Sequence, residues 1–288
     1  MLHFSSATQL TLDAGTTLWN EGFHGYPLTM TTDPIRYVQR YAEENLSPTL
    51  SVIAWEENQP IGFVYNGTRI HQGESIAWNG GTGIVPRYRN QGVGQLLMEE
   101  VINTYAKQGI QRAFLEVLSE NEPAIRLYQG LGYKEIGRLH VLRHPDIQAP
   151  IPLPNDPLRC ATRQEIGSLS FYQHESPWQC QWMNGIHTEA WIVEDEENQP
   201  VGYSLYRMTL DERGKRTSMN LLQTAVHPTH PDPERILLAT LYPLLQPGNH
   251  SRAALNIPAN HPVLPLLKDL GFEHTFEQLA MERLVPSG

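Results

Sequence analysis

The six residues from Arg89 to Gly94, Arg-Asn-Gln-Gly-Val-Gly, have the composition of an anion-binding turn. An apolar run ending at Val85 precedes them, and apolar residues recur at helical spacing from Val93 onward. Glycine at a helix start lets backbone N–H groups converge on an anion, and the helix dipole favours negative charge there. The segment predicts a pyrophosphate site on the amides of residues 90–95, although a lone pair of glycines could also form only a tight turn.

The longer segment from Gly83 to Leu97 resembles the coenzyme A-binding motif of the GNAT N-acetyltransferases. That motif is a strand ending in V-x-P, then Q/R-x-x-G-x-G/A, then an amphipathic helix, and Arg89, Gly92 and Gly94 fill its three fixed places. A second signature follows: Leu115-Glu116-Val117, Asn121, Ala124, Leu127-Tyr128 and Leu131-Gly132-Tyr133. The two signatures occur in the family's order, and the resemblance covers residues 2–142.

The resemblance implies direct transfer of an acetyl group from acetyl-CoA to a primary amine. This reaction needs a neutral amine, a stabilised oxyanion and a proton for the departing thiolate. Tyr128 matches the family tyrosine that protonates the sulfur, and Glu116 matches a glutamate that relays the amine proton in the ribosomal-protein branch. Tyr128 could instead only pack its ring, and Glu116 could be a surface charge. The first half has no cysteine, so no acyl-enzyme is expected.

The resemblance also implies which residues hold the coenzyme. In the family two central strands splay apart, and the pantetheine arm pairs with the strand ending at Ile84 and Val85. Their N–H groups are expected to serve the thioester oxygen as well. The predicted coenzyme-binding residues are Ile84, Val85, Arg89, Asn90, Gln91, Gly92, Val93, Gly94, Gln95 and Asn121. Asn121 could instead be only a helix N-cap.

The acceptor side is expected to come from the first helical region and the strand before the turn. Its candidates are Phe23, His24, Tyr26, Trp78 and Asn79, although aromatic residues are more often core and His24 could lie in a plain loop. The run Trp78–Gly83 is rich in glycine, which weakens strands and marks bulges or close backbone approach, as beside a ligand. An antibiotic, polyamine, amino acid, peptide N-terminus or lysine would all fit as acceptor.

The elements that position these residues are repeated along the chain. Glu56–Phe63 recurs as Glu196–Tyr203, Thr82–Pro86 as Thr224–Pro228, and Leu131–Tyr133 as Leu270–Phe272, each about 140 residues later. Five prolines between His144 and Pro157 indicate a linker. We therefore predict a GNAT N-acetyltransferase domain over 1–148 and a degenerate GNAT-like domain over 149–288.

The predicted fold class is α/β (α+β), with a mixed, mostly antiparallel sheet flanked by helices and repeated as a tandem GNAT fold. In the first half the patterns predict strands over Leu50–Trp55, Ile61–Arg69, Glu74–Val85, Ala113–Leu118 and Lys134–Leu142. They predict helices over Ile35–Glu44, which Asp33-Pro34 begins, over 92–109 and over Pro123–Gln129. Second-half helices are expected near Pro233–Leu245 and Pro262–Leu270.

The second half lacks the residues that could do the chemistry. Its segment Thr229–Arg235 has no glycine and carries Pro231 and Pro233, which lack the N–H groups that a pyrophosphate requires. The position equivalent to Tyr128 is Leu267, which cannot donate a proton. One site per chain is therefore expected. The histidines His227, His230 and His250 are more typical of a surface than of a metal site, because no cysteine accompanies them, and no metal is predicted.

The composition restricts the partners. A net charge of −10 argues against nucleic acid or an anionic membrane surface. No apolar window is long enough to span a bilayer, no secretory signal is visible, and two cysteines in the chain favour a reducing cytoplasm. The expected partner is a small-molecule or peptide amine, with the chain a monomer or weak homodimer. The rival function is a non-catalytic acyl-CoA-binding or regulatory module.

Overall fold

The computed structural model describes residues 1–144, 147, 156–185 and 187–286. The chain forms two compact units, unit 1 with Met1–Gly137 and Leu279–Gly288, and unit 2 with Arg138–Gln278. The predicted boundary at residue 148 and most of the proline-rich linker lie outside the described residues. The units divide within β6 (Lys134–His144) and within β12 (Glu273–Leu284), so each half of the chain ends in a strand whose last residues belong to the other unit.

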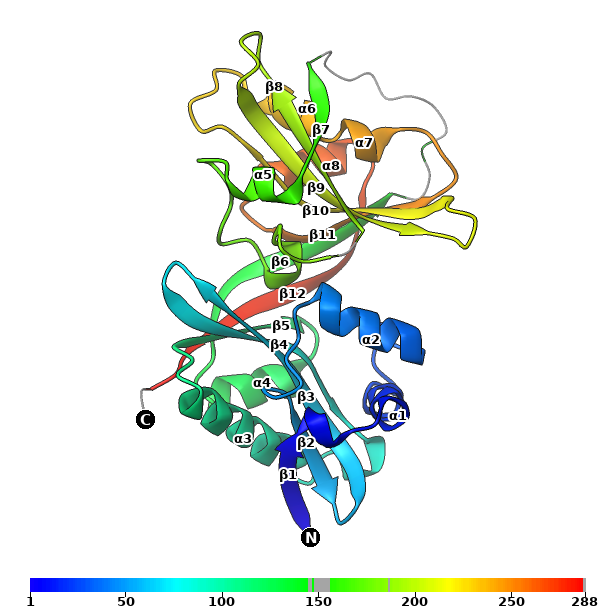
Figure 1. The fold of residues 1–288 in the computed structure, drawn as a ribbon, viewed down its shortest axis with the longest axis vertical. Helices are drawn as coiled ribbons and strands as arrows, with labels where there is room; N and C mark the ends of the chain where they lie inside the picture. The colour runs from blue at the N-terminus through cyan, green and yellow to red at the C-terminus, as the bar shows by residue number, and fades with distance from the viewer. Residues whose placement is uncertain (145–146, 148–155, 186, 287–288) are drawn as a thin grey trace. The chain divides into compact units, whose positions relative to one another are not determined.

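Unit 1 is built on a mixed sheet. Its strands lie in the order β1 (Leu2–Ser6), β2 (Val52–Glu56), β3 (Gln59–His71), β4 (Glu74–Ile84) and β5 (Arg112–Leu118), followed by the end of β12. The pairs from β1 to β4 are antiparallel, and β4 and β5 are parallel. Helices α1 (Leu12–Gly22) and α2 (Pro34–Glu43) cover one face, and α3 (Val93–Lys107) and α4 (Glu122–Gly130) cover the other (Figure 1).

The predicted strands and helices of unit 1 are confirmed, and one further strand and one further α-helix were not predicted. The Asp33 side chain caps α2 by accepting a hydrogen bond from the Arg36 N–H at 2.9 Å, as the Asp-Pro pair indicates. The unpredicted elements are β1 and α1. Helix α1 does carry a start signal, because the Thr11 side chain accepts the N–H of Ala14 at 3.2 Å.

The core of unit 1 lies between the sheet and the pair α3 and α4. Alternate residues of β5 point into it, and the helices contribute residues at helical spacing: Ala113, Leu115 and Val117 from β5, and Leu97, Val101 and Tyr105 from α3. Leu279 and Met281 of β12 complete the same core. Because β5 uses its odd-numbered side chains here, its even-numbered side chains point to the face covered by α1 and α2.

Unit 2 repeats the plan of unit 1. Its strands lie in the order β6 (its end), β11 (Ser251–Pro258), β10 (Arg216–Val226), β9 (Pro200–Leu210), β8 (Thr188–Glu194) and β7 (Leu158–Ala161). Its helices are α5 (Arg163–Gly167), α6 (Pro233–Thr240), α7 (Tyr242–Leu245) and α8 (Val263–Asp269). Strands β10 and β11 are parallel, as β4 and β5 are in unit 1. The mostly antiparallel sheet with flanking helices confirms the predicted fold class.

The repeat extends to single backbone bonds. The N–H of Tyr133 donates to the carbonyl of Tyr128 at 3.0 Å, and the N–H of Phe272 donates to that of Leu267 at 2.9 Å. A left-handed glycine precedes each donor, with φ of 83° at position 132 and 87° at position 271. These matching helix ends support the equivalence of Tyr128 and Leu267. No helix within the described ranges is long and apolar enough to cross a bilayer.

Candidate active site

Strands β4 and β5 separate part-way along their length. They pair only between Ile76–Asn79 and Arg112–Leu115. Beyond this point β4 continues to Ile84 and β5 to Leu118 with no further pairing between them. The splay that the family resemblance implies is therefore present, and it leaves one edge of β4 open.

The direction of the β4 backbone determines which amides face this gap. The Val85 N–H donates to the Ile61 carbonyl of β3 at 2.9 Å. Because backbone groups alternate in direction along a strand, the N–H groups of Thr82 and Ile84 point to the opposite, open edge. This corrects the expectation for Val85, whose donor is taken by β3, and leaves Ile84 as the donor available to a ligand.

The turn before α3 has the geometry of an anion cradle. Gly92 is the N-cap of α3 with φ of 80°, and no side chain caps the helix. A Cβ built on Gly92 meets no atom within 4 Å. The Leu96 N–H donates to the Gly92 carbonyl at 3.2 Å and so begins the helical ladder, which leaves the N–H groups of Val93, Gly94 and Gln95 without intrahelical acceptors. These amides fit a pyrophosphate.

Two glutamine side chains of the cradle turn away from it. The Gln91 amide donates to the Arg87 carbonyl at 2.6 Å, and the Gln95 amide donates to the Glu99 carboxylate at 2.7 Å. Asn90 contributes its backbone, which is left-handed with φ of 60°. A ligand in the cradle would therefore be bound by backbone N–H groups, as the glycine pattern predicts.

Arg89 has a different role from the one expected. Its guanidinium donates to three backbone carbonyls, at 2.9 Å to Ile84, 3.0 Å to Gly22 and 2.8 Å to His24. The backbone N–H of Arg89 donates to the Pro86 carbonyl at 3.1 Å. Arg89 therefore ties the cradle to the end of α1 and to β4, so that it positions the loop.

Tyr128 lies in α4, beside the gap, and Asn121 is the N-cap of that helix. Tyr128 is 7% exposed, and burial raises the pKa of its phenol while a hydrogen bond with Thr82 opposes that shift. The raised pKa keeps the phenol protonated at neutral pH. Burial and the neighbouring Tyr128 raise the pKa of Tyr26 to about 12. The Asn121 side-chain oxygen caps α4 by accepting the Ala124 N–H at 3.3 Å, which leaves its amide NH2 for a ligand.

Glu116 points to the opposite face of the sheet from Tyr128. The indole N–H of Trp78 donates to its carboxylate at 2.7 Å. Burial raises the pKa of Glu116 to about 7, the Trp78 hydrogen bond opposes the shift, and the charge of Glu44 adds to it. The group is thus partly ionised at neutral pH, as a general base requires.

The predicted acceptor residues divide into two groups. Phe23 and Tyr26 follow α1 with their rings 5.4 Å apart, and His24 beside them is exposed. Trp78 and Asn79 are buried in β4, and both are bonded within the protein. Asn79 donates to the Thr82 hydroxyl at 2.9 Å and accepts the Gly81 N–H at 3.0 Å. It therefore fixes the bulge of β4 at the point where the strands part, and only the first group remains available to an acceptor.

The glycines of β4 make room for aromatic rings, which corrects their interpretation as a ligand-facing run. A Cβ at Gly83 would stand 2.5 Å from the Phe63 ring, and one at Gly81 would stand 3.3 Å from the Trp19 ring. A Cβ at Gly80 would collide with the ring of Trp78. The glycines thus allow α1 to pack closely on the strand.

A polar and aromatic cluster from α2 was missed by sequence reasoning. The Tyr37 hydroxyl donates to that of Tyr65 at 2.7 Å, and Arg40 donates to Glu44 at 2.6 Å. The i, i+4 spacing of Arg40 and Glu44 was a visible signal for an ion pair, but such pairs usually lie on a solvated face. Here the two side chains are only 19% and 10% exposed.

In unit 2 a histidine side chain occupies the equivalent strand edge. Strands β10 and β11 pair from Ser218 and Ser251 as far as Leu221 and Ala254, and then they separate. The His261 ring nitrogen lies 3.0 Å from the carbonyl of Thr224, the residue that repeats Thr82. Burial lowers the pKa of His261, so the ring is neutral at neutral pH. A side chain of the protein itself therefore bonds to the edge that is open in unit 1.

The start of α6 also carries its own anion. The Asp232 side chain caps the helix by accepting the Arg235 N–H at 3.2 Å. A carboxylate at this position caps one of the amides that the corresponding turn before α3 leaves open. With Pro231 and Pro233 beside it, the segment offers few N–H groups to a second anion.

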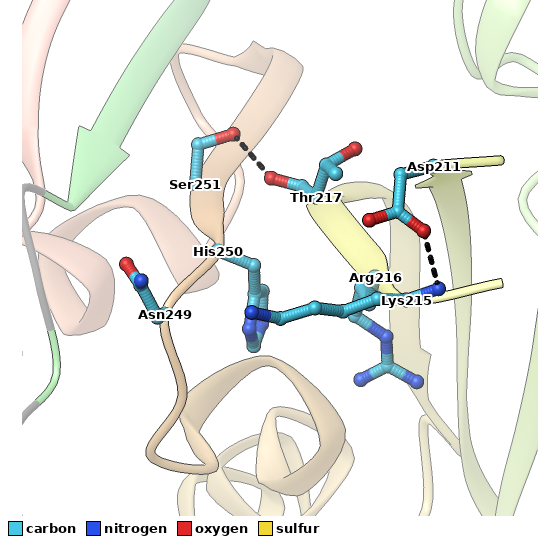
Figure 2. Close-up of a pocket in the computed structure, with 7 residues that line it drawn as sticks. All are labelled: Asp211, Lys215, Arg216, Thr217, Asn249, His250 and Ser251. Carbon is cyan, nitrogen blue, oxygen red and sulfur yellow. Dashed lines mark hydrogen bonds between the residues drawn. The ribbon is translucent and has the colours of Figure 1, made fainter. Parts of the chain in front are cut away.

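Figure 2 shows a pocket of about 410 Å³ in unit 2, between the turn after β9 and the start of β11. Its lining residues are Asp211, Lys215, Arg216, Thr217, Asn249, His250 and Ser251. The Asp211 carboxylate accepts the Lys215 N–H at 2.8 Å, so it stabilises its own turn. None of the predicted catalytic or coenzyme-binding residues lines this pocket. Among the described residues no group of three or more potential ligands could hold a metal ion.

Comparison with known proteins relates unit 1 to N-acetyltransferases. The acetyltransferase (GNAT) family matches residues 16–133. The chain is similar to the ribosomal protein bS18-alanine N-acetyltransferase of Escherichia coli (strain K12), with 42% identity over 50 residues, which are 17% of this chain and 34% of that protein. It is similar to N-alpha-acetyltransferase 30 of Schizosaccharomyces pombe, with 29% identity over 106 residues, 36% of this chain and 70% of that protein.

The fold of the whole chain has a counterpart among solved structures. A tandem GNAT protein from the clavulanic acid biosynthesis pathway superposes with a TM-score of 0.69 and 14% identity, covering 100% of both chains. This likeness confirms the tandem GNAT fold. The match to the ribosomal-protein enzyme spans only about a third of that enzyme's length, 34%.

Proposed function

Residues 16–133 belong to the GNAT acetyltransferase family, and we propose that the chain transfers an acetyl group from acetyl-CoA directly to a primary amine at one site in unit 1. The observation that carries the proposal is the gap between β4 and β5, with Glu116 on one face of the sheet and Tyr128 on the other. The amine and acetyl-CoA can approach such a gap from opposite faces of the sheet. In this proposal Glu116 serves as the proton acceptor and Tyr128 as the proton donor.

The residues of the gap suit each proton transfer of this reaction. The amine nitrogen bonds to the thioester carbon as the carbon–sulfur bond breaks, and Glu116 takes the proton that the amine gives up. The Tyr128 phenol gives its proton to the departing sulfur and then regains one from solvent, and the Glu116 carboxyl releases its proton to solvent. The Ile84 N–H on the open edge can donate to the thioester oxygen as charge develops there. The amides of Val93, Gly94 and Gln95 hold the pyrophosphate.

The test is release of free thiol from acetyl-CoA with a panel of primary amines, including a polyamine, amino acids, peptides with free N-termini and an aminoglycoside. Turnover with at least one amine supports the proposal. Binding of acetyl-CoA by calorimetry with no turnover of any amine would instead favour a non-catalytic acyl-CoA-binding module.

Replacing Tyr128 by Phe should lower kcat about ten- to a hundredfold, because it removes one hydrogen bond to a developing thiolate, about 1.5–3 kcal/mol. The matched control is Tyr133→Phe, since the Tyr133 hydroxyl is buried without a hydrogen-bond partner and its ring lies 5.9 Å from that of Tyr128. Steady-state kinetics with a fixed amine should show the loss only for Tyr128→Phe. Equal losses in both variants would assign the effect to packing.

Calorimetric titration should give one bound acetyl-CoA per chain. In unit 2, His261 bonds to a carbonyl of the strand edge, and the Asp232 cap and two prolines leave few amides for a pyrophosphate at the start of α6. The Gly92→Val variant should then keep this one site, with its affinity lowered by about 10²-fold or more. A site of wild-type affinity that persists in that variant would place a coenzyme site in unit 2.

We also propose that the protein works in a reducing compartment, the cytoplasm, as a monomer or weak homodimer. Both cysteines are free thiols, with Cys180 buried and Cys160 exposed. The role proposed for unit 2 is that of a degenerate GNAT-like domain that supports unit 1.

A further inference from the structure

Arg40 of α2 is fixed at the point where β4 and β5 part. Its guanidinium donates to the Gly80 carbonyl, in the bulge of β4 that immediately follows Trp78 and Asn79. It also lies over the Trp19 ring of α1, 4.2 Å from the ring centroid. The planar guanidinium can make the hydrogen bond and the stacking contact together, which a lysine ammonium cannot.

Glu44 holds the other side of the same guanidinium. The Arg40 Nε donates to its carboxylate at 2.6 Å, and the two side chains are largely buried. The Glu44 charge also acts on Glu116. Trp78 donates its indole N–H to Glu116. The pair of Arg40 and Glu44 therefore acts on Glu116 in two ways, through the bulge next to Trp78 and through charge.

We propose that Arg40 and Glu44 are positioning residues for Glu116: Arg40 fixes the β4 bulge that presents Trp78, and Glu44 holds the Arg40 guanidinium there and adds its negative charge to the surroundings of Glu116. This inference rests on the proposed function of Glu116 as the base. No residue of α2 belongs to the motifs that carry the family resemblance. The pair therefore extends the site beyond those motifs, to residues that act on Glu116 through Trp78 and through charge.

The charges around Glu116 give the sign of the effect. From β4, the Trp78 N–H stabilises the carboxylate form. From α2, the negative Glu44 opposes that form, and Arg40 partly neutralises Glu44. Removing the charge of Glu44 should therefore let Glu116 ionise at lower pH.

The experiment measures kcat/KM against pH for the full chain and for Glu44→Gln, which keeps an oxygen acceptor for Arg40. The acid limb of the profile should move to lower pH, so that kcat/KM at pH 6, relative to its plateau, rises severalfold. The control is Glu43→Gln, which removes the same charge from the neighbouring, partly exposed position and should leave the limb unchanged. Glu44→Asp, which keeps the charge, should restore the limb.

A second readout does not depend on turnover. The carboxyl of Glu116, followed by NMR in protein labelled with 13C-glutamate and assigned with Glu116→Gln, should titrate at lower pH in Glu44→Gln. A uniform fall in kcat/KM with an unmoved limb and an unmoved titration would show a purely structural pair and overturn the inference. If no amine is acetylated, the proposed function fails, and the titration still decides whether Glu44 acts on Glu116.

Discussion

Glu116→Gln should lower kcat/KM by about 10²–10⁴-fold, the usual contribution of a positioned general base. The amide is nearly the same size and can still accept the Trp78 N–H, so the bulge of β4 should persist. It cannot take a proton from the amine. The matched control is Glu122→Gln, which alters an exposed carboxylate at the start of α4 that pairs with Arg126.

The pH profile separates a base from a carboxylate that only binds the acceptor. Burial raises the pKa of Glu116 to about 7, so below that pH the group is protonated and cannot act as a base. The wild-type kcat/KM should rise with pH and level off above about pH 7. In Glu116→Gln the acid limb should vanish. A limb that persists at the same pH in this variant would belong to another group and would remove Glu116 from the mechanism.

The same shift has a consequence for stability with the opposite sense. Between the ordinary glutamate pKa of 4.5 and about 7, the folded chain holds a proton on Glu116 that the unfolded chain releases. Stability from this group is therefore full at low pH and falls as pH rises through that window. Glu116→Gln should raise the melting temperature at pH 8 more than at pH 5, measured by scanning calorimetry. Stability is thus given up at the position where the proposed chemistry needs a neutral-range base.

Local patterns predicted the parts of the site that depend on neighbouring residues. The Asp33-Pro34 helix start, the glycine cradle and the helix end at Gly109 are set by backbone geometry within a few residues. Helix α1 carried the same kind of signal at Thr11 but had no strong apolar periodicity to accompany it. The short edge strand β1 had none of the flanking turn residues that mark a strand.

The errors concern side chains whose partners lie far away in the sequence. Arg89 was expected at the coenzyme, but its guanidinium donates to Gly22 and His24, more than 60 residues earlier. The glycines of β4 suggested a ligand, but rings from α1 and β3 fill the space beside them. The placement of β12 in the core of unit 1 depends on the fold of the whole chain. A pattern along the sequence contains no information of this kind.

Gly92→Val should weaken acetyl-CoA binding by about 10²-fold or more, measured by calorimetry. Gly92 has φ of 80°, a conformation that costs a residue with a Cβ about 1–2 kcal/mol, so the backbone there should relax and turn the amides that follow it. Losing two hydrogen bonds to a charged pyrophosphate, each about 1.5–3 kcal/mol, accounts for that loss of affinity.

Gly109→Val is the matched control, because the chain offers the same strain at the other end of the same helix. Gly109 has φ of 68°, and a Cβ there also meets no atom within 4 Å. Gly109 follows the C-terminal end of α3, whose 15 residues span about 22 Å, so it lies about that far from the cradle. Both variants should lose similar thermal stability, and only Gly92→Val should lose the coenzyme. If Gly109→Val weakened binding equally, the loss would come from strain on α3, and the amides of the cradle would not be the pyrophosphate site.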